Sequence, residues 1–189
     1  MSDSNYLTDQ LLIAMPRLDD PNFSHTVTYV CEHNDEGAMG IVINRPLDGG
    51  LHLSDILEHL DIQVEDPRLH DQPVFSGGPV ETERGFVIHT PTGRWDSSLH
   101  VTPEIGITTS RDILEAIARD EGPAQYRVAL GYAGWGAGQL EQELSENTWL
   151  STPATDSLLF DTDHDQLWEA AASQLGIDPR LLSGEAGHA

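Results

Sequence analysis

The chain has 189 residues, 38% of them hydrophobic and 22% charged, which is enough material for one packed domain. Nine positive residues, all arginines and scattered along the chain, face 32 Asp and Glu, so the net charge is −23 and direct binding to nucleic acid is disfavoured. The apolar runs fall short of the roughly 20 residues that a membrane helix needs, and the acidic N-terminus does not resemble a secretory signal, so we expect a cytoplasmic protein without membrane contact.

The N-terminal part of the sequence predicts three strands. Residues 11–15 form a short apolar run closed by Pro16, and residues 26–32 are rich in β-branched and aromatic side chains. Residues 38–44 follow after a turn at Gly37. Because a strand, a short turn and a second strand follow each other, an antiparallel hairpin is expected.

The middle of the chain alternates short helices with strands. We predict a helix over 54–60 with Ser54 as its N-cap, and a strand end followed by a glycine-rich bend within 74–80. A strand over 85–90, a loop over 91–98 and a short strand over 105–108 follow. Ser110 then precedes an amphipathic pattern typical of a helix.

The C-terminal part predicts a strand over 127–132, a bend over 133–138 and a helix over 139–147. An extended segment and a last helix over 167–175 follow, with Asp163 and Gln166 spaced as a capping box. This order of elements lacks a βαβ rhythm. It predicts a single α+β domain over 1–189, with a mostly antiparallel sheet, a core over about 7–175 and loose termini.

LGYAGWGAGQLEQEL, residues 130–144, places four glycines and two aromatic residues just before a predicted helix. Glycine permits close backbone approach, and Tyr132 and Trp135 each carry an apolar body with one polar group. Such a bend suits a ligand pocket. The alternative is that these aromatic residues complete the domain core.

Three blocks of the chain resemble the YqgE/AlgH family of small bacterial proteins. They are LLIAMPRLDDPNFSHTVTYVCEHNDEGAMGIVINRP, FSGGPVETERGFVIH and LGYAGWGAGQLEQELSENTWL, and together the resemblance spans about residues 7–152. It implies coiled and bifurcated β-sheets with a few short helices, and no defined biochemical activity. The AlgH branch is described as a transcriptional regulator connected with alginate synthesis in pseudomonads, a label that does not itself establish DNA contact. With this composition, any regulatory role is expected to be indirect.

Two segments are candidates for binding a small anionic ligand. Asn44 and Arg45 end a predicted strand, where Arg45 could be a fixed cation and Asn44 could instead serve the turn. Gly77 and Gly78 could present backbone N–H groups to an anion, with Arg84 nearby. The segment lacks the lysine and helix of a phosphate-binding loop, so a plain turn is the alternative. We hypothesise that Arg45, Gly77, Gly78 and Trp135 converge on one surface region.

Cys31 is the single cysteine, and a straight strand would place it on the same face as His33. A histidine near a thiol can generate a reactive thiolate, although lone cysteines are usually buried. A metal site with His25 would lack a fourth ligand, so no metal and no cofactor are predicted. The sequence therefore favours a regulatory module that binds a ligand or a protein, with a thiol-dependent enzyme using Cys31 and His33 as the alternative.

Overall fold

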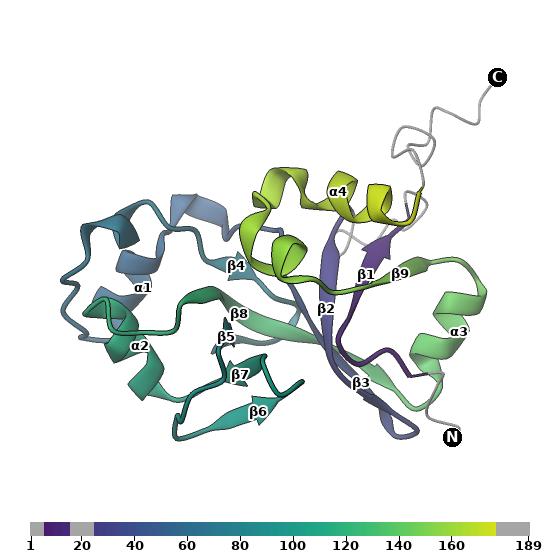
Figure 1. Cartoon of the computed structure of the whole chain (residues 1–189), viewed down its shortest axis with the longest axis horizontal. Coiled ribbons are helices and arrows are strands. Elements are labelled where there is room, and N and C mark those ends of the chain that lie inside the picture. The colour runs from purple at the N-terminus through teal and green to yellow at the C-terminus, as the bar shows by residue number, and fades with distance from the viewer. Residues whose placement is uncertain (1–5, 16–24, 177–189) are drawn as a thin grey trace.

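A computed structural model describes residues 6–15 and 25–176. Its strands form one curled sheet with the order β6-β7-β5-β8-β3-β2-β1-β9, in which every pairing along this path is antiparallel (Figure 1). β4 pairs with β8 in parallel, off this path. The strands are β1 (Gln10–Ala14), β2 (Val27–Asn34), β3 (Gly37–Val42), β4 (Phe75–Ser76), β5 (Val80–Thr90), β6 (Ser98–His100), β7 (Gly106–Thr108), β8 (Gln125–Gly136) and β9 (Trp149–Pro153).

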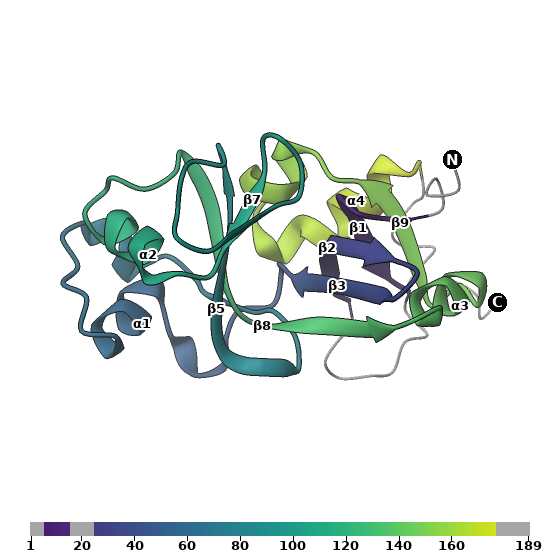
Figure 2. The ribbon, with the colours of Figure 1, turned by 90° about the horizontal axis from the view of Figure 1, so that it is seen from below.

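Short helices cover the sheet, so the predicted α+β class with a mostly antiparallel sheet is confirmed. In Figures 1 and 2, α1 and α2 lie beside β4–β7 at one end of the molecule, while α3 lies at the other end. The helices are α1 (Leu53–His59), α2 (Arg111–Ala118), α3 (Gln139–Ser145) and α4 (Leu167–Gln174), with shorter turns η2 (Asp48–Gly50), η3 (Pro67–His70), η4 (Ser157–Asp161) and η5 (His164–Gln166).

Strand β8 joins the two halves of the sheet. Residues 125–130 and Tyr132 of this strand pair with β5, whereas residues 133–136 pair with β3 (Figure 2). The change of partner follows Gly131, whose φ of 84° only glycine adopts at little cost. The predicted bend over 133–138 is therefore wrong in its first part, because the strand continues to Gly136.

Three groups of buried side chains hold these layers together. The first packs β1–β3, β5 and β8 against η4 and α4. The second lies beneath α1, η3 and α2, and includes Leu57, Leu69 and Ile113. The third lies beneath α3 and includes Val30, Trp135 and Trp149. Alternate residues of β2 enter different groups, as the alternation of side chains along a strand requires.

Two local predictions need correction. The N-cap of α1 is His52, which exchanges hydrogen bonds with Asp55 as a capping box, while Ser54 is buried inside the helix. The loop predicted over 91–98 runs into the short edge strand β6, which begins at Ser98 and pairs with β7. Its exposed side chains give no alternation from which a strand could be recognised.

Candidate functional site

The glycines Gly77 and Gly78 serve a crossing of two backbones. The N–H of Ser76 donates to the carbonyl of Arg45, and the N–H of Gly77 donates to the carbonyl of Leu130, both at 2.7 Å. A Cβ on Gly78 would lie 2.2 Å from the carbonyl carbon of Tyr132. Both glycines are buried, and the Gly77 N–H is engaged in the crossing. This geometry corrects the expectation of an open nest of N–H groups.

Asn44 ties the end of β3 to the start of β2. Its side-chain oxygen accepts from the Val27 N–H at 2.8 Å, and its amide nitrogen donates to the His25 carbonyl at 3.1 Å. Arg45 is half-buried and contributes its carbonyl to the crossing. Asn44 thus stabilises the end of its strand, in agreement with the alternative from the sequence that it serves the turn and does not bind a ligand.

Trp135 is 7% exposed and donates its indole N–H to Glu143 of α3 at 3.0 Å. It belongs to the third buried group, whereas a Cβ on Gly77 would touch Ile41 and Ala129 of the first. The hypothesis that Arg45, Gly77, Gly78 and Trp135 share one surface region is therefore wrong for Trp135, which completes the core beneath α3.

Arg84 and Tyr132 are the pair of predicted ligand residues that the structure brings into one hollow, of about 410 Å³. Arg84 contacts Glu81 at 3.3 Å and lies over the ring of Phe86, 5.6 Å from its centroid. Tyr132 packs edge-on against the same ring.

Cys31 and His33 do not form a pair. The register of β2 against β3 shifts between Val30 and Glu32, so Cys31 is the extra residue of a bulge. Cys31 enters the first buried group, where burial raises the pKa of its thiol well above the ordinary range. His33 instead lies beside α3, with Nε2 3.2 Å from Glu141 although off the direction of a hydrogen bond.

The imidazole of His33 also forms a hydrogen bond with the backbone near the N-terminus. Its Nδ1 accepts from the Leu7 N–H at 2.9 Å, and this fixes the neutral tautomer with the proton on Nε2. The expected shared face of Cys31 and His33 is thus wrong, because the bulge breaks the alternation on which it rested.

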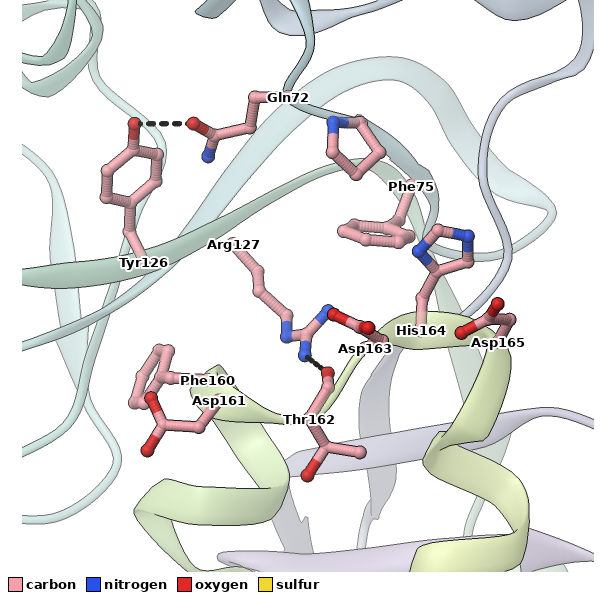
Figure 3. Close-up of a pocket in the computed structure, with 11 residues that line it drawn as sticks. Gln72, Phe75, Tyr126, Arg127, Phe160, Asp161, Thr162, Asp163, His164 and Asp165 are labelled. Atoms are coloured by element: carbon pink, nitrogen blue, oxygen red, sulfur yellow. Dashed lines mark hydrogen bonds between the residues drawn. The ribbon is translucent and has the colours of Figure 1, made fainter. Parts of the chain in front are cut away.

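A cleft around Arg127 was missed by the sequence analysis. It has a volume of about 350 Å³ and lies between β4, the start of β8 and the segment that links η4 to η5 (Figure 3). Arg127 reaches its floor from β8 and donates to the carbonyls of Leu159, Ile43 (3.4 Å) and Thr162 (2.6 Å). Its guanidinium also lies 5.4 Å from the centroid of the Phe75 ring. These contacts fix the guanidinium beneath the link between η4 and η5.

Arg127 is 8% exposed, and burial lowers the pKa of its guanidinium to about 10, with Asp163 and Asp161 acting in the opposite direction. The side chain is therefore charged at neutral pH. Figure 3 shows the carboxylate of Asp163 beside the guanidinium. The buried cation thus holds the backbone of the link in place and faces its acidic side chains.

The mouth of the cleft is acidic and partly aromatic. Asp161, Asp163 and Asp165 line it and are exposed, and of these Asp163 lies beside the guanidinium, while the carboxylates of Asp161 and Asp165 point away from it (Figure 3). Asp161 accepts from Gln125 at 2.6 Å, whereas neither Asp163 nor Asp165 accepts a side-chain hydrogen bond from a described residue. Aromatic side chains line the same cleft, namely Phe75, Tyr126 and Phe160. Carboxylates next to aromatic faces are the surroundings that a cationic group prefers.

The signal for this cleft was present but weak. Arg127 is a charged residue at the start of the apolar run RVALGY, and residues 161–165 read DTDHD. Alternating acids of this kind also suit a solvated helix start. Because Arg127 lies 35 residues before Thr162 in sequence, spacing alone does not join the two segments.

The roomiest of these hollows lies elsewhere, between α1, α2 and the sheet, with about 600 Å³ and mostly apolar walls. Its arginine, Arg111, is already paired with Glu115 at 2.9 Å. It gathers fewer charged groups than the Arg127 cleft, so we take the latter as the candidate site.

A family model described as AlgH-like matches residues 11–180, most of the chain. The chain belongs to the AlgH-like family. This confirms the resemblance to the YqgE/AlgH family. A UPF0301 protein of Thioalkalivibrio sulfidiphilus is 60% identical to it over the full length of both, and one of Nitrosococcus oceani is 56% identical over 97% of each.

Solved structures agree with this AlgH-like assignment. The solution structure of the AlgH protein from Pseudomonas aeruginosa has a TM-score of 0.79 and 47% identity, covering 100% of this chain and 99% of that one. A crystal structure of a Corynebacterium diphtheriae protein has a TM-score of 0.69 at 18% identity, with 89% and 86% covered. At that identity the likeness concerns the fold alone.

Within residues 6–15 and 25–176, none of the helices is long and apolar enough to cross a membrane. In the same part of the chain, no three His, Cys, Asp or Glu side chains gather as they would around a metal ion.

Proposed function

We propose that this AlgH-like chain is a binding module that recognises a positively charged segment of a protein partner at the Arg127 cleft. The observation that carries the proposal is the surplus of carboxylates at the cleft. Asp161, Asp163 and Asp165 all line the cleft, whereas Arg127 is the single guanidinium among its lining residues and is already engaged with backbone carbonyls.

The cleft suits an arginine side chain better than a small anion. Its carboxylates can accept from the N–H fork of a guanidinium, and the Phe160 and Tyr126 rings offer apolar faces beside them. An anion would have to approach the same three carboxylates. The cleft therefore supports a protein partner over the small anionic ligand expected from the sequence.

The charge of the whole chain supports the same partner. With a net charge of −23, the protein attracts basic segments over a distance and repels nucleic acid. Such attraction raises the association rate and weakens as salt is added. We therefore propose an indirect effect on transcription, exerted in the cytoplasm through a protein partner. Duplex DNA that bound at moderate salt would contradict this part of the proposal.

The test is a titration of the purified chain with a fluorescent peptide that carries four arginines separated by glycines. We expect the double variant Asp163→Asn/Asp165→Asn to bind about tenfold more weakly, since exposed ion pairs contribute up to about 1 kcal/mol each. The matched control is Asp35→Asn/Glu36→Gln in the exposed β2–β3 turn, which removes the same charge. Its affinity should change by less than about twofold.

Equal losses in the two double variants would mean that the peptide senses only the diffuse negative charge, and the proposed cleft would then be wrong. A peptide with glutamate in place of arginine should not bind. Replacing arginine by lysine should weaken binding, because lysine lacks the planar fork.

A further inference from the structure

A second group of polar side chains lies outside the Arg127 cleft, where β5, β6 and β7 meet. The hydroxyl oxygens of Ser98 and Thr108 are 2.6 Å apart, and Thr108 Oγ1 is 2.7 Å from Nε2 of His89. Nδ1 of His89 is 2.9 Å from the carbonyl oxygen of Pro91. Ser98, Thr108 and His89 thus form one hydrogen-bonded chain that ends on the backbone.

The Pro91 carbonyl determines which group donates and which accepts in each of these hydrogen bonds. The Pro91 carbonyl can only accept, so Nδ1 of His89 carries the proton and Nε2 is an acceptor. Thr108 must therefore donate to Nε2, which leaves its oxygen to accept from Ser98. The Ser98 proton points toward Thr108 Oγ1, and the remaining lone pairs of the Ser98 oxygen are available to an outside group.

The sheet register builds this arrangement. Ser98 pairs with Thr108 across β6 and β7, and the Thr109 N–H donates to the Ser97 carbonyl at 3.0 Å. Ser98 and Thr108 thus form a non-hydrogen-bonded pair, in which side chains lie closest. Gly106 faces His89 across β5 and β7, and a Cβ there would approach Cε1 of the ring to 3.0 Å. Glycine therefore leaves room for the ring.

The three hydrogen-bonded side chains differ in burial. His89 and Thr108 are both 0% exposed, whereas Ser98 is exposed. Burial lowers the pKa of His89; the hydrogen bond to the Pro91 carbonyl acts in the opposite direction, and His100 of β6 lowers it further. Tyr126 is the register partner of His89 on β8. The ring is therefore neutral at neutral pH and able to take a proton.

Ser98 opens into the hollow of about 410 Å³ that also holds Arg84 and Tyr132. This volume is in the range of small-molecule pockets, about 300–1,000 Å³. Met39, Leu99 and Ile107 add apolar walls. Arg84, which is paired with Glu81 of the same hollow, and Tyr132 also line it, and both side chains carry donors for a charge that develops on a bound carbonyl oxygen.

We propose that Ser98 is a nucleophile that hydrolyses small carboxylic esters, with Thr108 and His89 as the residues that relay its proton. Hydrogen-bonded relays of this kind activate serine hydroxyls by giving the proton a base to move to. This activity is separate from the proposed function, because the lining residues of the two sites do not overlap.

In the first half of the reaction, Ser98 Oγ bonds to the ester carbonyl carbon. Its proton passes to Thr108 as the Thr108 proton passes to His89 Nε2. The carbon–oxygen bond to the alcohol then breaks, and the departing oxygen takes a proton from Thr108, which recovers one from His89. Water repeats the sequence on the acyl-serine, so ester and water become acid and alcohol.

The experiment treats the purified full chain with a fluorophosphonate probe and follows labelling by intact mass and peptide mapping. We expect Ser98 to react at least about tenfold faster than other serines, within the range that a positioned base contributes. Ser98→Ala should abolish this fast labelling, and Ser145→Ala, at an exposed serine of α3 outside this hollow, should leave it unchanged.

The relay is tested at Thr108. Thr108→Val should slow the labelling of Ser98 at least about tenfold, and Thr108→Ser should restore it, because only serine keeps the hydroxyl. A purely structural role for Thr108 would not predict this rescue. The proposal is overturned if Ser98 in the wild-type chain is labelled no faster than Ser145. A folded Thr108→Val variant with the wild-type labelling rate would overturn it equally.

Discussion

Trp135 and Trp149 donate their indole N–H groups to one carboxylate oxygen, Oε1 of Glu143, at 3.0 and 2.9 Å. Their rings meet edge to face with centroids 6.1 Å apart. Trp135 belongs to β8, Trp149 to β9 and Glu143 to α3, so one side chain joins three elements. Two indole N–H groups thus share one acceptor, and this has a measurable consequence.

Replacing Glu143 by alanine should leave both indole N–H groups without this partner. We expect a loss of about 1–3 kcal/mol in the free energy of unfolding, since the Trp135 N–H loses its acceptor and a buried unsatisfied donor costs about that much. Urea titration followed by tryptophan fluorescence measures it. The control is Glu146→Ala, an exposed residue whose carboxylate accepts only from Gln142 among the described residues. Similar losses in both variants would show that the shared acceptor is unimportant.

The backbone crossing at Gly78 should not tolerate any side chain. Its φ is 153°, and an added Cβ would meet the backbone of Tyr132 and Ala133, which cannot move aside as a side chain could. Gly78→Ala should therefore cost more than about 4 kcal/mol or prevent folding. Gly50→Ala, at φ 70° with open space around it, should cost only about 1–2 kcal/mol. Thermal unfolding of the soluble fraction compares them, and equal midpoints would contradict the predicted clash.

Cys31 should be inert while the protein is folded. It is 2% exposed, and its Sγ lies 3.7 Å from the Tyr29 carbonyl oxygen, consistent with a weak hydrogen bond. Burial raises the pKa of the thiol, so the reactive thiolate is suppressed. A disulfide reagent such as dithionitrobenzoate should react quickly with Cys31 in urea. In buffer the reaction should be slow, because it is limited by the rate at which the folded protein opens and exposes the thiol. Rapid reaction of the native chain would restore the thiol-enzyme alternative.

Asp66 should make stability depend on acid. Its carboxylate binds Arg68, which also reaches Asp120 at 2.8 Å, and the hydrogen bonds from Arg68 hold the pKa of Asp66 below its ordinary value. A lowered pKa contributes stability above the ordinary value near 3.8, and this contribution is lost as the pH falls through the folded value. Asp66→Asn should thus lower the unfolding midpoint at pH 7.

The difference in unfolding midpoint between the wild-type chain and Asp66→Asn should disappear as the pH falls below 4. Asp71→Asn removes an exposed carboxylate from the same segment and serves as the control. A gap between Asp66→Asn and the wild type that persists unchanged in acid would assign the effect to something other than ionisation.

Patterns within a few neighbouring residues correctly predicted those helices and turns that short-range interactions along the chain determine. The apolar spacing of Ile113, Leu114 and Ile117 after Ser110 marks α2, and Gly37 with a φ of 139° marks the first hairpin. The splitting of the sheet was expected only from the family resemblance. Glycines 134 and 136 suggested a bend, although they continue β8 beside β3.

The site residues show why the remainder could not be predicted. The bulge at Cys31 moves His33 to another face, and nothing in the sequence around it marks an extra residue. Arg127 finds its partners 32 and 35 residues downstream, beyond the reach of any periodicity. Such contacts depend on tertiary packing, which local propensity does not encode.

The sharing of β8 by two halves of the sheet constrains how the chain can change. If one residue were inserted between 127 and 136, the side chains before the insertion would still point to their present faces of the sheet. Those after it would point to the opposite faces. Apolar side chains of one half would then face solvent while the other half stayed intact. Length changes are therefore expected to concentrate in the connections between strands, and β8 should keep its length even where its side chains vary.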